Sequence, residues 1–218
     1  MSRRTWPLAR RYVLPPFLAG GLFLLSGRRS SGCALLAVAG SVLAFFRDPP
    51  RPLPQDPWLV YAASDGFVTA VDHDVPEPWL PSGRGTRITV FLSLHNVHVN
   101  RSPVTGQIIR MEQLGDGFAP ALMSAAKDNR RNRLALDGPA GPVVVVQVAG
   151  ALARTISNWV GVGDQVVAGQ HLGLIHFGSR TDVLLSPDAA DVLVSRGTRV
   201  RAGVTALARL RPATAARA

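Results

Sequence analysis

The sequence predicts a mainly β protein, a compact β-sandwich or hybrid-barrel-like domain with an internal repeat, preceded by an N-terminal hydrophobic helical hairpin. The 218 residues include 21 glycines and 17 prolines but only 6% aromatic residues, a composition typical of short strands joined by turns. Apolar side chains recur at every second position from Ile88 to Leu94, as in a half-buried strand. The pattern Gly-x-x-Val-x-x-Gly occurs at residues 163–169 and again at 197–203, which predicts a repeated unit of turn, short strand and turn.

Residues 1–47 are predicted to form a membrane-associated hydrophobic hairpin. Two apolar stretches of 14 residues each, 12–25 and 33–46, flank a polar connection. A helix needs about 20 apolar residues to cross a bilayer, and Pro15 and Pro16 are expected to interrupt a regular helix in the first stretch. Two short tilted spans, a cleaved signal peptide and a buried core hairpin remain alternatives to a hairpin that dips into one leaflet.

The positive charge of the chain is concentrated in this hairpin. Residues 1–47 carry seven arginines and no acidic residue, whereas the remaining 171 residues carry 17 basic and 14 acidic residues. Because the excess charge brackets apolar segments, it favours anionic lipid headgroups as partners. Nucleic acid is not expected as a partner, since its binding sites more often interleave basic and aromatic residues along a groove. A single cysteine, Cys33, excludes an intrachain disulfide and a cysteine zinc cluster.

The region after the hairpin divides into a linker and one domain. Residues 48–57 contain five prolines and predict a stiff, extended linker, so the domain that follows it is assigned to residues 58–218. Its strand candidates are residues 60–63, 66–71, 86–94, 106–111, 143–149 and 173–177. Residues 121–126 predict a short helix or a loop, and the charged segment 127–133 is interpreted as a solvated face.

Three residues at predicted strand ends could together carry chemistry. Asp65, His98 and Ser179 are an acid, an imidazole and a hydroxyl, the parts of a nucleophile activated by an oriented base. Each also has a structural interpretation, since Asp before Gly and Ser after Gly are common turn pairs. The residue types alone therefore leave open whether the three side chains converge.

A metal site is the other chemistry considered for the histidines. His95 and His98 could act with His73, His171 or His176 as ligands. The three-residue spacing of the first pair matches no zinc signature, and an extended strand would turn the two rings to opposite faces. No metal is therefore expected.

Several segments resemble the short class of bacterial phosphatidylserine decarboxylase proenzymes. They are residues 91–106, FLSLHNVHVNRSPVTG, and residues 173–183, GLIHFGSRTDV. Residues 63–66, ASDG, and residues 45–49, FFRDP, after the hydrophobic N-terminus, resemble the same family. The likeness thus spans nearly the whole chain. It departs from the family at residues 129–132, which read NRRN where NERN is expected.

This resemblance implies that the chain is a precursor that cuts itself between Gly178 and Ser179. The products would be a large chain, 1–178, and a small chain, 179–218, which stay associated. Asp65 and His98 match the acid and base that activate Ser179, and His95 is an accessory catalytic candidate. Ser179 would become a pyruvoyl group, so that neither pyridoxal phosphate nor a metal is needed.

The implied activity is decarboxylation of phosphatidylserine to phosphatidylethanolamine and CO₂ through a Schiff base with the pyruvoyl group, a step of phospholipid biosynthesis. Arg101 and Arg180 are candidates for holding the lipid phosphate or carboxylate. The implied location is the bacterial cell membrane, with the catalytic domain on the cytoplasmic side, peripheral or shallowly inserted, and a higher oligomer is possible. The rivals are a membrane-associated serine hydrolase using Asp65, His98 and Ser179 without cleavage, and a lipoyl-like carrier. A carrier would need a lysine at a hairpin tip, and the chain has only Lys127.

Overall fold

The computed structural model describes residues 2–117, 129–150, 155–176 and 179–211. The chain divides into two compact units, Met1–Pro50 and Arg51–Ala218. The division falls inside the predicted linker.

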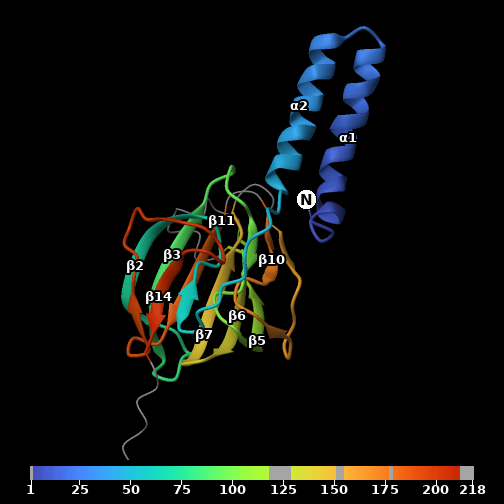
Figure 1. Cartoon of the computed structure of the whole chain (residues 1–218). Coiled ribbons are helices and arrows are strands. Elements are labelled where there is room, and N and C mark those ends of the chain that lie inside the picture. Colours follow the sequence, from blue (N-terminus) through green and yellow to red (C-terminus); the bar gives the residue numbers. More distant parts are fainter. Residues whose placement is uncertain (1, 118–128, 151–154, 177–178, 212–218) are drawn as a thin grey trace, which may run out of the picture. The chain divides into compact units, whose positions relative to one another are not determined.

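The first unit is a hairpin of two helices, α1 (Trp6–Leu25) and α2 (Arg29–Phe45), drawn in blue in Figure 1. The expectation that Pro15 and Pro16 interrupt the first helix is wrong, because α1 continues through both. Each proline removes one backbone donor from the helix, and close packing against α2 offsets part of this loss. At the contact, a Cβ on Gly32 would lie 3.0 Å from the carbonyl oxygen of Gly20.

The outer surface of this hairpin is apolar. Its exposed large side chains include Trp6, Leu14, Phe17, Leu18, Leu22, Leu25, Val38 and Leu43. By length and composition α1 could cross a membrane, whereas α2 is shorter. A signal sequence near the N-terminus has the same length and composition, so a membrane span and a signal peptide both remain alternatives for α1.

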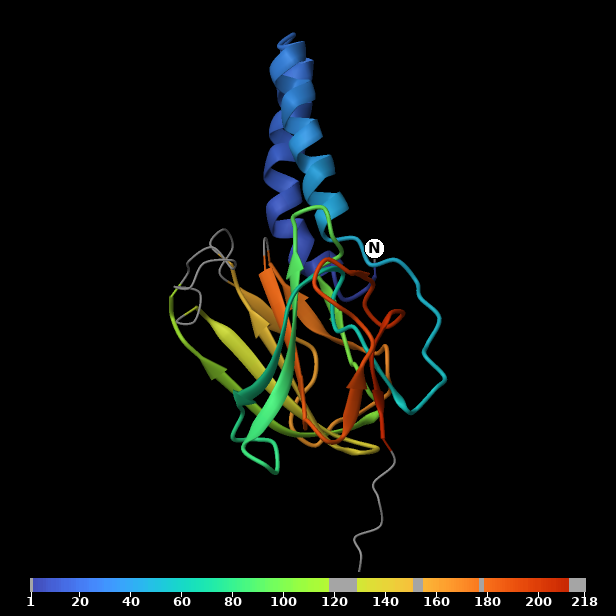
Figure 2. The same ribbon diagram turned by 90° about the vertical axis from the view of Figure 1, so that its left-hand side faces the viewer.

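The described part of the second unit consists of three antiparallel sheets. The large sheet runs in the order β13 (Arg199–Val200), β2 (Gly66–Pro76), β3 (Arg84–Leu92), β11 (Ser179–Leu185), β7 (Gly141–Val148), β6 (Arg131–Gly138), β5 (Gly106–Leu114) and β9 (Gln165–Val166). One small sheet contains β1 (Leu59–Tyr61), β14 (Ala206–Leu210) and β12 (Ala190–Val192), and the other contains β4 (Val99–Arg101), β10 (His171–Ile175) and β8 (Ile156–Asn158). The large sheet is curled (Figures 1 and 2). The predicted mainly β fold class with a helical hairpin ahead of it is confirmed.

All six strand candidates overlap strands of the structure, whereas β4, β6, β8, β11, β12 and β14 were not predicted. The interpretation of residues 127–133 as a solvated face is wrong for its described end, because Arg131 opens β6 and Asn132 is buried. The predicted helix at 121–126 lies outside the described residues.

The main core lies on one face of the large sheet, here called the inner face. Val183 of β11 belongs to it, together with side chains of β1, β10 and β14 from the two small sheets. Leu184, the next residue of β11, packs into a second apolar cluster on the opposite, outer face. Because successive side chains of a strand alternate between faces, Ser179 and Thr181 share the inner face with Val183. Arg180 and Asp182 share the outer face with Leu184.

The predicted internal repeat is present in the structure. In each copy a glycine turn, a two-residue strand and a second glycine turn follow one another, with positive φ at Gly163, Gly169, Gly197 and Gly203. The short strands β9 and β13 pair with the first residues of β5 and β2. Since both copies bind the start of a long strand in the same way, residues 62–68 and 102–108 also correspond.

Candidate active site

Ser179 is the first residue of β11 and pairs with Leu92 of β3. The residue is fully buried, and its Oγ has no hydrogen-bond partner in the described part of the chain. Thr181, two residues along the same face, shares a hydrogen bond with the hydroxyl of Ser64. A buried hydroxyl that makes no hydrogen bond costs about 1–3 kcal/mol, and such a group calls for a functional explanation. Gly178, the other half of the predicted cleavage pair, lies outside the described residues.

His98 is also fully buried and directly precedes β4. Its Nδ1 lies 3.0 Å from the carbonyl oxygen of Asn96, and its own carbonyl accepts a hydrogen bond from the backbone N–H of Ile175. A proton on Nδ1, donated to Asn96, leaves Nε2 as the basic nitrogen of the ring. Because Ile175 ends β10, four residues before Ser179, the fold holds the backbone of His98 beside the strand that precedes the serine in the chain.

Asp65 is bound by an arginine that sequence reasoning missed. Arg51 donates from Nη1 to Oδ1 at 2.6 Å and from Nη2 to Oδ2 at 2.8 Å. The backbone N–H of Ala202 also donates to Oδ1, at 2.8 Å, and Arg51 donates to the carbonyl of Ala202. The two side chains are only 3% (Arg51) and 12% (Asp65) exposed. In this arrangement the carboxylate faces Arg51, and the carbonyl of Asn96 orients His98. The role of Asp65 toward His98 stays a prediction.

Comparison of the two repeat copies distinguishes the contact by which Asp65 closes a turn from its contact with Arg51. At the corresponding position of the other copy stands Thr105, whose Oγ1 accepts a hydrogen bond from the backbone N–H of Ala168 at 3.0 Å. This contact matches the one between Asp65 and Ala202. Closing the repeat turn is therefore a structural task that either side chain performs. Only the copy that contains Asp65 adds a second carboxylate oxygen and an arginine, Arg51, that binds it.

The remaining predicted site residues differ in exposure. His95 is exposed in the turn after β3, with its Nε2 3.2 Å from the hydroxyl of Ser93. Arg101 is buried and donates to the carbonyl of Gly169 at 3.0 Å. Arg180 forms an ion pair with Asp182 on the face of the sheet opposite to Ser179. The substrate-binding roles of the two arginines stay predictions, and the alternation of β11 argues against that role for Arg180.

A row of buried amides lies on the inner face near Ser179. Gln147 of β7 pairs in register with Thr181 of β11 and with Asn132 of β6. Its side chain accepts a hydrogen bond from Asn132 at 2.7 Å and donates one to Asn100 at 2.7 Å. Asn100 lies in β4, two residues after His98, so the row connects β7, the neighbour of the serine's strand β11, with the strand that follows the imidazole. Asn100 and Asn132 lie in segments already compared with the family, at residues 91–106 and 129–132, but no sequence signal marked Gln147, because a single amide within a strand forms no motif.

His176, the last described residue before Ser179, is a second histidine that sequence reasoning left without a catalytic role. It is fully buried, with its Nε2 3.0 Å from the hydroxyl of Ser157. Across the described ranges, no group of three His, Cys, Asp or Glu side chains is arranged to hold a metal ion.

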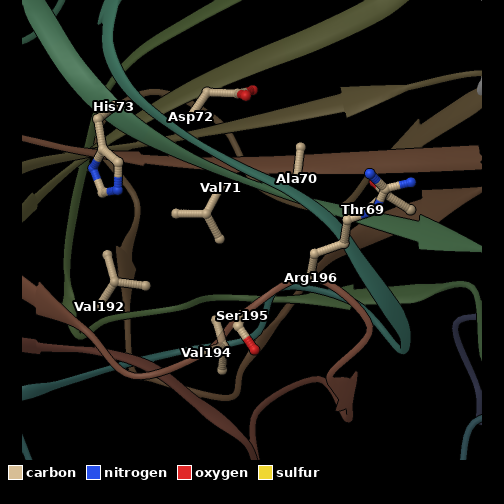
Figure 3. Close-up of a pocket in the computed structure, with 9 residues that line it drawn as sticks. All are labelled: Thr69, Ala70, Val71, Asp72, His73, Val192, Val194, Ser195 and Arg196. Atoms are coloured by element: carbon tan, nitrogen blue, oxygen red, sulfur yellow. The ribbon is translucent and has the colours of Figure 1, made fainter.

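Two cavities lie away from Ser179. The larger, about 490 Å³, is an open groove between β2 and residues 192–196, with Val71, Val192 and Val194 among its apolar lining (Figure 3). Asp72 and His73 also line it, and none of the predicted site residues does. The smaller, about 280 Å³, lies on the outer face of the large sheet and is lined in part by Arg180.

Comparison with known proteins identifies relatives across most of the chain. Residues 39–208 match the family model described as phosphatidylserine decarboxylase. The phosphatidylserine decarboxylase proenzyme of Symbiobacterium thermophilum is 41% identical over 96% of this chain and 95% of its own length. The proenzyme of Thermobifida fusca is 42% identical, over 91% and 89% of the two chains, and that of Mycolicibacterium gilvum is 42% identical, over 89% and 87%.

Proposed function

The chain belongs to the phosphatidylserine decarboxylase family, and we propose that it converts phosphatidylserine to phosphatidylethanolamine and CO₂ with a pyruvoyl group made from its own Ser179. The observation that carries this proposal is the buried Oγ of Ser179, which has no hydrogen-bond partner among the described residues. Ser179 begins β11, and the strand before it in the chain, β10, runs beside the buried His98. These residues fit a group that is generated in place from the chain itself.

Self-processing begins with the hydroxyl of Ser179. His98 takes the hydroxyl proton at Nε2, and Oγ attacks the carbonyl carbon of Gly178. The C–N bond breaks, the nitrogen of residue 179 takes a proton, and an ester replaces the peptide bond. Glycine on the acyl side favours this step, because a residue without Cβ tolerates a strained turn.

Elimination then separates the two chains. Loss of the Cα proton of residue 179 expels residues 1–178 as a carboxylate and leaves dehydroalanine. Its imine tautomer reacts with one water molecule, releasing ammonia and leaving the pyruvoyl ketone on residue 179. We further propose that Asp65, held by Arg51, stabilises the positive charge on His98 during the first step.

Residue 179 of β11 would hold the pyruvoyl group, which would supply a carbonyl able to bind the substrate amine and to act as the electron acceptor for decarboxylation. His95 is the candidate proton donor to the carbon that loses CO₂, since its ring is exposed and lies in the turn three residues before His98. Arg101 remains a candidate for binding the lipid phosphate, but it would first have to break its hydrogen bond to the carbonyl of Gly169.

The small chain is expected to stay bound after cleavage. β11 pairs with β3 over seven residue pairs and with β7 over six. β14 pairs in addition with β1 of the large chain. These ladders and the shared core do not depend on the bond between residues 178 and 179.

The hairpin would bring the catalytic unit to a substrate that does not leave the bilayer. We propose that α1 and α2 insert into the bacterial cell membrane with the catalytic unit on the cytoplasmic side, and that a higher oligomer can form. Protease digestion of sealed right-side-out vesicles tests the orientation. Protection of residues 51–218 is expected, and their digestion in intact vesicles would contradict it.

A denaturing mass spectrum of the purified full chain tests the proposed function. Fragments 1–178 and 179–218 are expected, the smaller with a pyruvoyl-blocked N-terminus. Ser179→Ala should leave the chain intact and abolish CO₂ release. An active preparation consisting only of the intact chain would refute the proposal and leave the serine hydrolase.

His98 and His95 are expected to act in different steps, the first in processing and the second in turnover. His98→Ala is expected to block processing, whereas His95→Ala should be processed normally and release CO₂ more slowly. Equal effects of the two substitutions on processing would contradict this division.

A further inference from the structure

The smaller cavity, about 280 Å³, is a cleft on the outer face of the large sheet. It is lined by Pro76, Glu77, Pro78, Arg87, Leu114, Arg131, Arg133, Val146, Val148, Arg180, Asp182 and Leu184. Four of these residues are arginines and two are acidic. We call it the arginine cleft.

Strand register aligns two of the arginines around one apolar residue. Val148 of β7 pairs with Arg180 of β11 on one side and with Arg131 of β6 on the other. Directly paired residues point to the same face of a sheet, and neighbouring strands lie about 4.8 Å apart. Arg131 and Arg180 therefore flank Val148, with their Cα atoms about 10 Å apart, a span that two long side chains can close around one ligand.

Ion pairs account for three of the four arginines. Arg133 is bound to Glu77 at 2.5 Å, and Arg87 is bound to Asp72, a residue outside the cleft, at 2.7 Å. The Nε of Arg180 lies 3.1 Å from Asp182.

Arg131 is the arginine of the cleft that forms no ion pair with the described residues. Its Nε is buried and has no hydrogen-bond partner in the described part of the chain. A buried guanidinium nitrogen without an acceptor is costly, and an anionic ligand would supply the acceptor. Burial also raises the pKa of Asp182, against the opposing effect of Arg180 and Arg87. Because burial penalises the charged form of Asp182, this carboxylate is a poor competitor for Arg180.

We propose that the arginine cleft binds a phosphate group, held between Arg131 and Arg180. Guanidinium groups present paired donors that match phosphate oxygens, and two of them on either side of an apolar floor fix its position. Arg180 points away from Ser179, so this site is separate from the reacting groups. On the proposed function, Arg180 belongs to the small chain and Arg131 to the large one, so that the bound phosphate bridges the two chains. The phosphate can come from a lipid headgroup or from solution.

Calorimetry on the purified full chain in a neutral detergent tests the site. The two probes are inorganic phosphate and glycerophosphoglycerol, a soluble phosphodiester that has no amine to react with a ketone. Arg131→Gln removes a charge without leaving an acidic partner behind in the described residues, so the fold should be retained. The substitution should weaken binding about tenfold or more, the equivalent of one charge-assisted hydrogen bond. Arg209→Gln, on β14 outside the cleft, makes the same charge change and should leave the affinity unaltered.

The outcomes separate the two phosphate sources and the two proposals. Tighter binding of the diester would support the site and assign a lipid headgroup, and tighter binding of inorganic phosphate would support it and assign the free ion. Absence of saturable binding of either probe, or equal affinity in Arg131→Gln and the unsubstituted chain, would overturn the proposal. Ser179→Ala, which remains uncut, should bind phosphate as well. Binding there, with no CO₂ release by the unsubstituted chain, would retain the cleft and reject the proposed function.

Discussion

Replacing Arg51 by methionine should expose how much of the candidate site depends on one buried ion pair. The substitution keeps much of the side-chain volume but removes both hydrogen bonds from the guanidinium to Asp65. Removing one partner of a buried pair costs about 3–5 kcal/mol, because the other charge stays buried. Asp65 keeps its hydrogen bond from Ala202 and is 12% exposed. We therefore expect a loss of unfolding free energy at the lower end, about 3 kcal/mol.

Urea unfolding of the full chain in detergent, followed by tryptophan fluorescence, measures this loss. Ser179→Ala is used as the background so that every sample is one intact chain. Asp65→Asn combined with Arg51→Met should cost less than the sum of the single substitutions by about 2 kcal/mol, since no buried charge is then left without its partner.

Additive costs, or a loss below about 1 kcal/mol for Arg51→Met, would refute the reasoning that the pair is buried and coupled. In the chain that retains Ser179, Arg51→Met should also slow self-cleavage, and Arg51→Lys, which keeps the charge but not the paired donors, should recover part of the rate. A normal cleavage rate in Arg51→Met would show that processing does not need this ion pair.

Three further substitutions test other parts of the structure, all by urea unfolding. Gly66→Ala should cost more than about 2 kcal/mol, because its Cβ would lie 2.0 Å from a cross-strand carbonyl oxygen. Gly83→Ala, also at positive φ but in open space, should cost clearly less, and equal costs would contradict the steric argument. Gln147→Leu removes the hydrogen bond that Asn100 accepts and one of the two that Asn132 donates, and should cost about 2–4 kcal/mol, against almost nothing for the exposed Gln107→Leu. Because burial raises the pKa of Asp182, the folded chain keeps this proton at a pH where the unfolded chain has lost it. Unfolding free energy should then fall as pH rises from the ordinary carboxyl pKa through the raised folded value, and Asp182→Asn should flatten this fall; an unchanged slope would argue against the raised pKa.

Local patterns in the sequence were sufficient for much of the fold. The alternation at residues 86–94 predicted β3, and the paired glycine motifs predicted the repeat turns, because both depend on residues that are neighbours in the chain. Pro15 and Pro16 misled for the same reason. The intrinsic cost of proline in a helix is local, whereas the packing against α2 that offsets it is not.

The same difference between local patterns and long-range contacts applies to the candidate site. Asp65, His98 and Ser179 stood out by residue type and by their place at strand ends, and the comparisons support the family to which those motifs pointed. The buried amide Gln147 and the arginine Arg131 carried no such mark. Each lies in a strand whose neighbours come from distant parts of the chain.

By itself, the sequence determined the order of the elements, the apolar hairpin, the repeat and the residue types available for chemistry. Only the tertiary structure decided which side chains meet. Asp65 accepts a hydrogen bond from a backbone group 137 residues away, and its cation comes from a segment that reads as a linker. Sheet register and burial govern such pairings, because a buried charge must find its partner wherever the fold brings one within reach.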